Sequence, residues 1–302
     1  MKRVLKSIGM SFVELGLYLV MVGAISLSLI GLLYALDIGS SEGIPQQGFL
    51  DPFVTLVNPY IPLFIASFVA VVIVHKVIFQ RELDFSGITK HNIFSEFSIG
   101  IGWSAVAITS GFCILLILNM LDIVKFDLNA KLFIGFILLF LVQSAFEELI
   151  CRSFLLPTVA YRFNIITGLI VSSIFFGLMH WSNDHVSVLS IINLVLAGFF
   201  LGIIYLRYRS IWAAIGLHAG WNFIQGSFFG FEVSGVDVYS VIDTQETGPD
   251  ILTGGPFGFE GSILATVIMI TTMTLIWREA PSLFRGDYIT SASDGRRTYG
   301  AG

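Results

Sequence analysis

Residues 131–157 read KLFIGFILLFLVQSAFEELICRSFLLP, an apolar run that carries two adjacent glutamates, Glu147 and Glu148. A helix of about 20 predominantly apolar residues is long enough to cross a bilayer. Carboxylates at membrane depth are costly, so an intramembrane pair indicates a functional site. Arg152 follows Glu148 by four residues and supplies a possible ion-pair partner on the same helix face.

The composition indicates an integral membrane protein. The chain has 302 residues, of which 55% are hydrophobic and only 12% charged, whereas soluble domains carry roughly 25% charged residues. The net charge of -5 says little about a nucleic-acid partner, because acidic and basic residues are segregated by loop; we expect no such partner. Cys113 and Cys151 both lie in apolar runs, so we expect buried thiols rather than a disulfide.

Apolar segments of suitable length predict an all-α, polytopic transmembrane helical bundle of about eight spans. The predicted spans are residues 11–36, 59–80, 97–120, 131–156, 163–181, 187–206, 210–226 and 261–277. The first run is too long for the apolar region of a signal peptide, so we interpret it as a retained helix.

The basic residues predict that both termini are cytoplasmic. With eight spans, nearly all lysines and arginines fall on one side of the membrane, and only Lys125 and Lys131 fall on the other. Such an excess marks the cytoplasmic side. We expect the cell membrane of a prokaryote as the location.

Four regions follow from this pattern: N-terminal helices in 1–130, a catalytic four-helix core in 131–226, an external loop in 227–260, and a last helix with a cytoplasmic tail in 261–302. The external loop is acidic, rich in glycine and phenylalanine, and begins and ends with the phrase Phe-Gly-Phe-Glu. It is interpreted either as a lid or re-entrant segment over an external mouth, or as an ordinary flexible connector. Its acidity weakly favours basic or externally presented peptides as substrates.

Helical spacing divides the polar residues of the apolar segments into two roles. Glu148 and Arg152 share a face and can pair, whereas Glu147 is rotated by about 100° and is left free to act as a general base. Further along, His218 and Asn222 share a face and offer donors to a developing oxyanion. His180 ends the run FGLMH.

Other intramembrane polar residues have simpler interpretations. His180 alone is equally well explained as a helix–helix hydrogen bonder, and we expect His75 and His185 to be bystanders or solvated. Glu14 is expected to extend its side chain to the cytoplasmic edge. The patterns Gly198–Gly202 and Gly216–Gly220 allow close helix approach.

Three short patterns follow one another in the sequence: Glu147-Glu-x-x-x-Arg152, Phe176-x-x-x-His180 and His218-x-x-x-Asn222. In this order they resemble the three motifs of the CAAX-protease and bacteriocin-processing family. Members of that family are intramembrane endopeptidases related to the type II CAAX prenyl endopeptidase. The resemblance covers residues 133–226. It implies that Glu147 activates water with help from His180, that His218 and Asn222 stabilise the oxyanion, and that Glu148 and Arg152 support them.

The resemblance implies hydrolysis of a membrane-associated peptide or protein without a covalent intermediate. We expect no cofactor, with zinc bound by Glu147, His180 and His218 as a metalloprotease-like alternative. The pattern His-Glu-x-x-His is lacking. A non-enzymatic membrane scaffold of the same fold, or less plausibly a proton-coupled transporter, would retain the same polar residues.

The predicted span ends create one conflict. With an N-terminus inside, Glu147 lies towards the cytoplasm and His180 near the outer end of its span. The two would then differ in depth by roughly half a bilayer.

Overall fold

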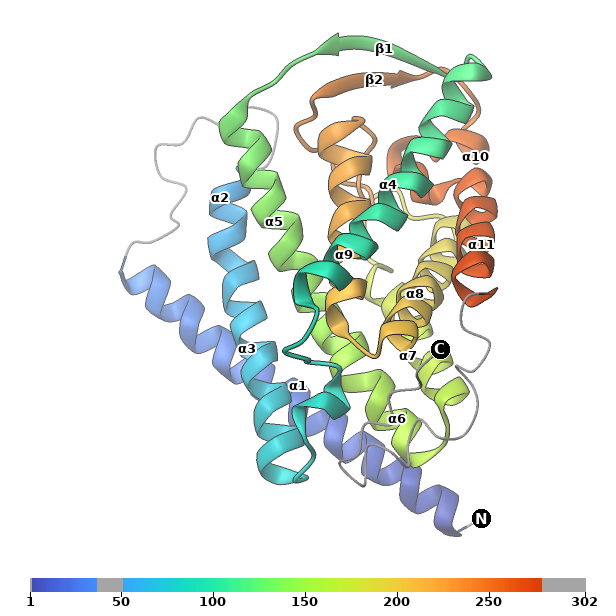
Figure 1. Cartoon of the computed structure of the whole chain (residues 1–302). Helices are drawn as coiled ribbons and strands as arrows, with labels where there is room; N and C mark the ends of the chain where they lie inside the picture. The colour runs from blue at the N-terminus through green and yellow to red at the C-terminus, as the bar shows by residue number, and fades with distance from the viewer. Residues whose placement is uncertain (1, 37–50, 279–302) are drawn as a thin grey trace.

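The computed structural model describes residues 2–36 and 51–278; the predicted cytoplasmic tail lies outside these residues. The main helices are α1 (Lys2–Ala35), α3 (Ile61–Val71), α4 (Ile93–Ile117), α5 (Ala130–Glu148), α6 (Leu156–Arg162), α7 (Ile165–Met179), α8 (Val188–Tyr208), α9 (Ile211–Asn222) and α11 (Ile263–Arg278). They form a bundle in which α1 lies against the outside of α3 (Figure 1).

Several helices continue through wider π-helical turns. These turns are η1 (Leu56–Tyr60), η2 (Val72–Ile78), η4 (Leu149–Leu155) and η5 (Phe223–Phe228). The η4 turn joins α5 to α6, so the helical run extends from Ala130 to Arg162. It follows directly after Glu147 and Glu148 and contains Arg152, which matches the tendency of π-turns to occur at functional sites.

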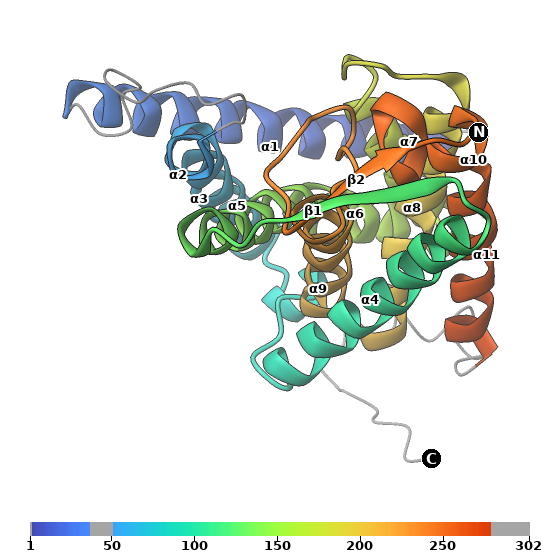
Figure 2. The same cartoon turned by 90° about the horizontal axis from the view of Figure 1, so that it is seen from above.

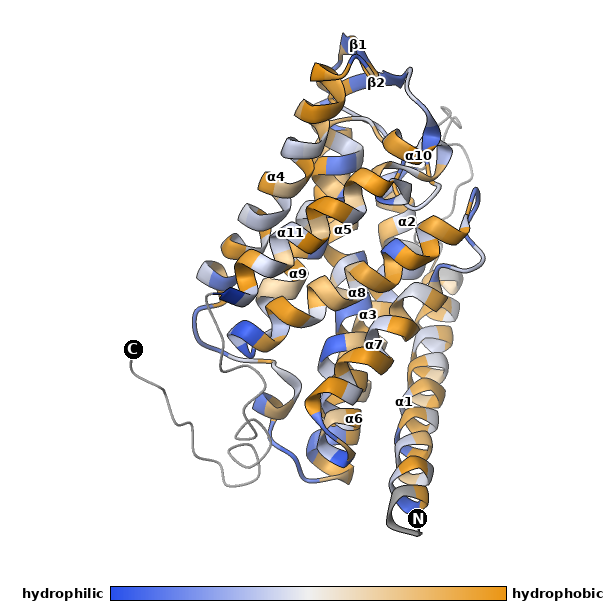
Figure 3. Ribbon diagram, turned by 90° about the vertical axis from the view of Figure 1, so that its right-hand side faces the viewer, coloured by the Kyte–Doolittle hydropathy of each residue, from blue (hydrophilic) through white to orange (hydrophobic). Residues whose placement is uncertain are grey.

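A helical membrane protein is confirmed, and all eight predicted apolar segments contain a helix. Five helical runs in the described part of the chain are long and apolar enough to cross a membrane, whereas Ile165–Met179 and Ile263–Arg278 are shorter apolar helices. Hydrophobic residues cover the helices, and hydrophilic residues gather at their ends and in the loops (Figure 3). The count of eight spans and the cytoplasmic orientation of the termini stay predictions.

Helices α4 and α9 cross with their backbones in close contact. A Cβ atom added to Gly216 would lie 2.1 Å from the carbonyl oxygen of Phe97, and one added to Gly220 would lie 2.2 Å from Oγ of Ser104. A Cβ on Gly198 would meet the backbone of Ser173 in α7. The two glycine patterns therefore lie at close helix contacts.

The prediction that Glu14 extends its side chain to the cytoplasmic edge is wrong. Its side chain is fully buried and pairs with Arg81 and Arg162 rather than extending to a solvated edge. Two guanidinium groups from distant segments of the chain reach the carboxylate, so it need not leave the interior. Of the two expectations for His75, the structure agrees with a structural hydrogen bonder and not with a solvated ring, because the buried ring bonds to the hydroxyls of Ser86 and Thr158.

The segment after η5 is packed against the bundle and is not an ordinary flexible connector. It contains β2 (Ile242–Glu246), α10 (Asp250–Thr253) and the short turns η6 (Gly255–Phe257) and η7 (Phe259–Gly261). The phenylalanines of both repeated phrases, Phe229, Phe231, Phe257 and Phe259, are buried in the core. This burial explains the repeated apolar pairs.

The all-α prediction missed a small sheet. Strand β1 (Leu121–Phe126) pairs antiparallel with β2, from Leu121 opposite Glu246 to Phe126 opposite Ile242. The two strands pass over the end of α9 (Figure 2). They lie across one end of the bundle (Figure 1).

Candidate active site

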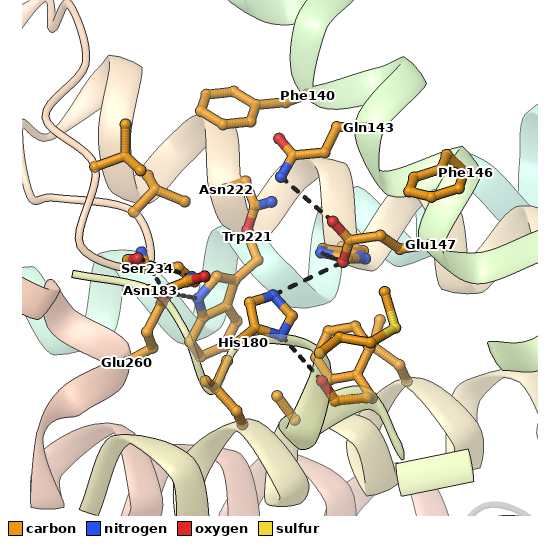
Figure 4. Close-up of a pocket in the computed structure, with 18 of the residues that line it drawn as sticks. Phe140, Gln143, Phe146, Glu147, His180, Asn183, Trp221, Asn222, Ser234 and Glu260 are labelled. Carbon is orange, nitrogen blue, oxygen red and sulfur yellow. Dashed lines mark hydrogen bonds and ion pairs between the residues drawn. The ribbon is translucent and has the colours of Figure 1, made fainter. Parts of the chain in front are cut away.

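A cavity of about 570 Å³ lies between α5, α7, α8, α9 and residues 229–261, the segment predicted to be external and named the external segment for that reason. It brings together Glu147, His180, His218 and Asn222, the four residues for which the sequence predicts direct roles in catalysis. Figure 4 shows Glu147 and His180 directed towards one another, with Asn222 nearby. The supporting pair Glu148 and Arg152 does not line the cavity and is buried behind the residues that do.

The depth conflict does not arise, because the fourth helical run is longer than expected and the fifth helix is shorter. Fifteen residues separate Glu147 from Arg162, where α6 ends, and fifteen separate Ile165, where α7 begins, from His180. At 1.5 Å per residue, both side chains lie roughly 22 Å from the same turn. Because these two helical runs are antiparallel, the side chains of Glu147 and His180 lie at the same depth.

The Glu147 carboxylate has one oxygen with a hydrogen-bond partner and one buried oxygen without a partner. Its Oε1 accepts a hydrogen bond from Nε2 of Gln143, one helical turn earlier, at 3.3 Å. Its Oε2 has no hydrogen-bond partner, and lies 3.9 Å from Nε2 of His180 and 3.8 Å from Nε2 of His218. Three polar atoms thus converge at one point of the cavity.

Each histidine ring is held by a hydrogen bond at Nδ1, the ring nitrogen that does not face Glu147. Nδ1 of His180 donates to the carbonyl oxygen of Phe176 at 2.9 Å. Nδ1 of His218 lies 2.9 Å from Oε1 of Glu148 and donates to that carboxylate. Each Nε2 atom is therefore left to face Glu147, and the two rings differ in having a neutral and a charged partner.

Glu148 and Arg152 form the predicted ion pair, with 2.9 Å between Nη1 and Oε1 and both side chains fully buried. Nη2 of Arg152 donates to the carbonyl oxygen of Gly198 at 2.9 Å, and the guanidinium lies over the ring of Phe176, 4.7 Å from its centroid. Arg152 therefore connects α8 and the ring of Phe176 to Glu148, the carboxylate that holds His218.

The spacing of the three converging atoms was compared with that of a zinc site. Two ligand atoms at 2.0–2.1 Å from a tetrahedral zinc ion lie about 3.3–3.4 Å apart. The distances from Glu147 to the two histidines exceed this by roughly half an ångström. Among the described residues, no group of three or more histidine, cysteine, aspartate or glutamate side chains is arranged to hold a metal ion.

Sequence reasoning missed several polar residues of the cavity wall: Gln143, Asn183, Trp221, Ser234 and Glu260. Gln143 could have been found, because it lies four residues before Glu147 on the same helix face. Helical spacing could not identify the other four residues, because they come together only when the external segment packs onto α9.

The fold and the site describe a helical membrane protein in which a glutamate, two histidines and an asparagine surround a cavity. Residues 129–224 match the model of a family described as type II CAAX prenyl endopeptidase Rce1-like. This segment, about a third of the chain, is similar to the Rce1-like CAAX proteases, which are peptide hydrolases. No curated protein matches the chain.

Proposed function

We propose that this protein is an intramembrane endopeptidase in which Glu147 activates a water molecule for attack on a peptide bond of a membrane-associated peptide or protein. The observation that carries the proposal is the buried Oε2 of Glu147, which has no hydrogen-bond partner and faces Nε2 of both histidines at the cavity. A general base must lie within reach of the water it deprotonates, with a position for the reacting carbonyl beside it.

The hydrogen bonds favour different protonation states for the two histidines. Glu147, Glu148 and Arg152 together carry one net negative charge, and a single added proton makes this buried group neutral. His218 is the better place for that proton, because its Nδ1 faces a carboxylate, whereas Nδ1 of His180 faces a carbonyl oxygen. A neutral His180 then presents an acceptor at Nε2, and a charged His218 presents a donor.

The reaction follows from these states. Glu147 takes a proton from water while Nε2 of His180 accepts a hydrogen bond from the same molecule. The water oxygen attacks the scissile carbonyl carbon, and the charge on the carbonyl oxygen is received by Nε2–H of His218 and the side-chain amide of Asn222. Glu147 then delivers its proton to the departing amine, and no covalent enzyme intermediate forms.

Metal-free catalysis is part of the proposal. Donors from His218 and Asn222 take the place of a Lewis acid at the developing oxyanion, and the spacing around Glu147 is wider than zinc coordination requires. Metal analysis of purified protein, together with binding of Zn²⁺ measured by calorimetry, tests this point independently of activity. Stoichiometric zinc that Glu147→Gln abolishes would favour the zinc alternative.

The apolar part of the cavity wall suits an apolar substrate. Phe140, Phe146, Leu201 and Met269 line it beside the polar site. The matched family is described as prenyl endopeptidases, and we propose that an isoprenyl group or an apolar peptide segment occupies this space. Paired peptides with and without a prenyl group decide between the two.

Comparison of new peptide termini in membranes tests the function directly. Cells expressing the wild type at matched levels should contain termini that are absent with Glu147→Gln. The exposed Glu82, outside the cavity, provides the control Glu82→Gln, which should retain those termini. Identical termini with inserted wild type and Glu147→Gln would contradict proteolysis and favour the scaffold; solute flux in vesicles would favour transport.

A further inference from the structure

The wall of the cavity formed by the external segment contains a second polar site, around Glu260. A tight turn joins Val233 and Val236 by two backbone hydrogen bonds. Its central residues, Ser234 and Gly235, both have positive φ, at 50° and 85°, as a type I′ turn requires. This turn places Ser234 beside Glu260.

Donors from two elements hold the Glu260 carboxylate. Its Oε1 accepts from the backbone N–H and from the hydroxyl of Ser234, each at 2.6 Å. Its Oε2 lies 3.3 Å from Nε1 of Trp221 in α9, which donates more closely to Gln225 at 2.8 Å. Asn193 in α8 fixes the main chain by donating to the carbonyl oxygen of Glu260.

This site holds a negative charge without a nearby cation. Donors from N–H and O–H groups stabilise the ionised carboxylate, and Glu260 is 5% exposed. The described residues that line the cavity include three carboxylates but no lysine or arginine, so the carboxylates outnumber the cations even with the charged His218 proposed above: Glu147, Asp184 and Glu260. The cavity therefore has a negative potential that favours a cationic ligand.

We propose that Glu260 and Trp221 form a substrate subsite for a positively charged side chain, lysine or arginine, of the peptide cleaved beside Glu147. Oε2 of Glu260 retains acceptor capacity, because its one donor is shared with Gln225. The indole of Trp221 adds a ring that attracts cations. Figure 4 shows Glu260, Ser234, Asn183 and Trp221 on one side of the cavity and Glu147 on the other.

This inference rests on the proposed proteolysis and extends it to the class of substrate. A purely structural latch would need the hydrogen bonds of Glu260 but not its charge. The variant Glu260→Gln separates the two roles, since its amide oxygen can still accept from Ser234 while the negative charge is removed.

The test uses N-acetylated apolar peptides with lysine, norleucine or glutamate scanned through successive positions, and purified protein in nanodiscs. At one fixed position relative to the cleaved bond, the wild type should prefer lysine over norleucine in kcat/KM by at least tenfold, and glutamate should be the poorest. Glu260→Gln should reduce this preference to near unity with its melting temperature maintained. The matched control Asp237→Asn removes an exposed carboxylate of the same segment and should preserve the preference within twofold.

A wild type that cleaves lysine and norleucine peptides equally, a Glu260→Gln variant that keeps the preference, or an equal loss in Asp237→Asn would overturn the subsite. The wild-type comparison applies even if Glu260→Gln does not fold. Binding of the same peptides to Glu147→Gln separates this inference from the proposed reaction. A lysine preference in binding without any cleavage by the wild type would support the subsite and contradict proteolysis; equal or absent binding would overturn the subsite.

Discussion

Removal of the Arg152 guanidinium should destabilise the protein strongly. In the variant Arg152→Met, the Glu148 carboxylate stays fully buried but loses the cation at 2.9 Å. Breaking a buried ion pair in this way costs about 3–5 kcal/mol, since the buried group of Glu147, Glu148 and a charged His218 is left with one uncompensated negative charge. Using the relation for larger soluble domains, the melting temperature should fall by about 6–20 °C.

The paired variant Glu148→Gln/Arg152→Met should recover most of that loss, because neither partner then leaves a buried charge. It should not recover activity. The amide that replaces the Glu148 carboxylate cannot stabilise a charged His218, whose Nδ1 it contacts. We expect a loss of at least tenfold in kcat in this double variant, with its melting temperature near that of the wild type.

The chain contains its own reporter of unfolding. Cys151 is buried and Cys113 is exposed, so a thiol-reactive dye in a Cys113→Ala background reacts with Cys151 as the bundle opens. Melting of Arg152→Met within about 2 °C of the wild type would refute the assignment of a desolvated pair. A double variant less stable than Arg152→Met would refute the charge argument and indicate that lost packing dominates.

Three further predictions concern other parts of the molecule. Burial, opposed by the hydrogen bond from Thr253 and aided by the charges of Glu232 and Asp250, raises the pKa of Glu246 to about 7. Because this folded pKa exceeds the unfolded value, the external segment should lose stability as the pH rises from about 4.5 to 7. Limited proteolysis should therefore become faster across this range, and Glu246→Gln should flatten the rise. Gly216→Ala should separate α4 from α9 and lower the melting temperature, because its Cβ would meet the carbonyl oxygen of Phe97. The control is Gly102→Ala, whose added Cβ enters open space. Equal melting temperatures of the two variants would refute the close contact. Gln143→Leu should lower kcat by about tenfold with little change in KM, since it removes the hydrogen bond that orients the proposed base; an unchanged kcat would show that this bond has no catalytic role.

The motifs and helix spacing allowed much of the site to be predicted. Spacing of four residues along one helix correctly paired Glu148 with Arg152 and left Glu147 apart, because helix geometry is local. The separation of His180 from Glu147 was wrong for a different reason. Span ends estimated from hydropathy placed the end of the fourth helix at residue 156, six residues before the turn that sets the depth of both side chains.

Contacts between distant segments could not be predicted in this way. The pairing of Glu14 with Arg81 and Arg162 joins α1 to two later parts of the chain. Likewise, Glu260 reaches the cavity only because Asn193 and Ser234 hold its main chain and side chain. Composition described the external segment as acidic and glycine-rich, and its buried phenylalanines show that this composition belongs to a packed wall of the cavity.

The most direct test of the central claim is the turnover of one identified peptide by purified wild type and Glu147→Gln. Loss of a general base should reduce kcat/KM by about 10²–10⁴-fold, while the melting temperature and peptide affinity stay close to those of the wild type. A Glu147→Gln protein that folds, binds the peptide and retains more than a tenth of wild-type turnover would contradict the role of Glu147 as the base that activates water.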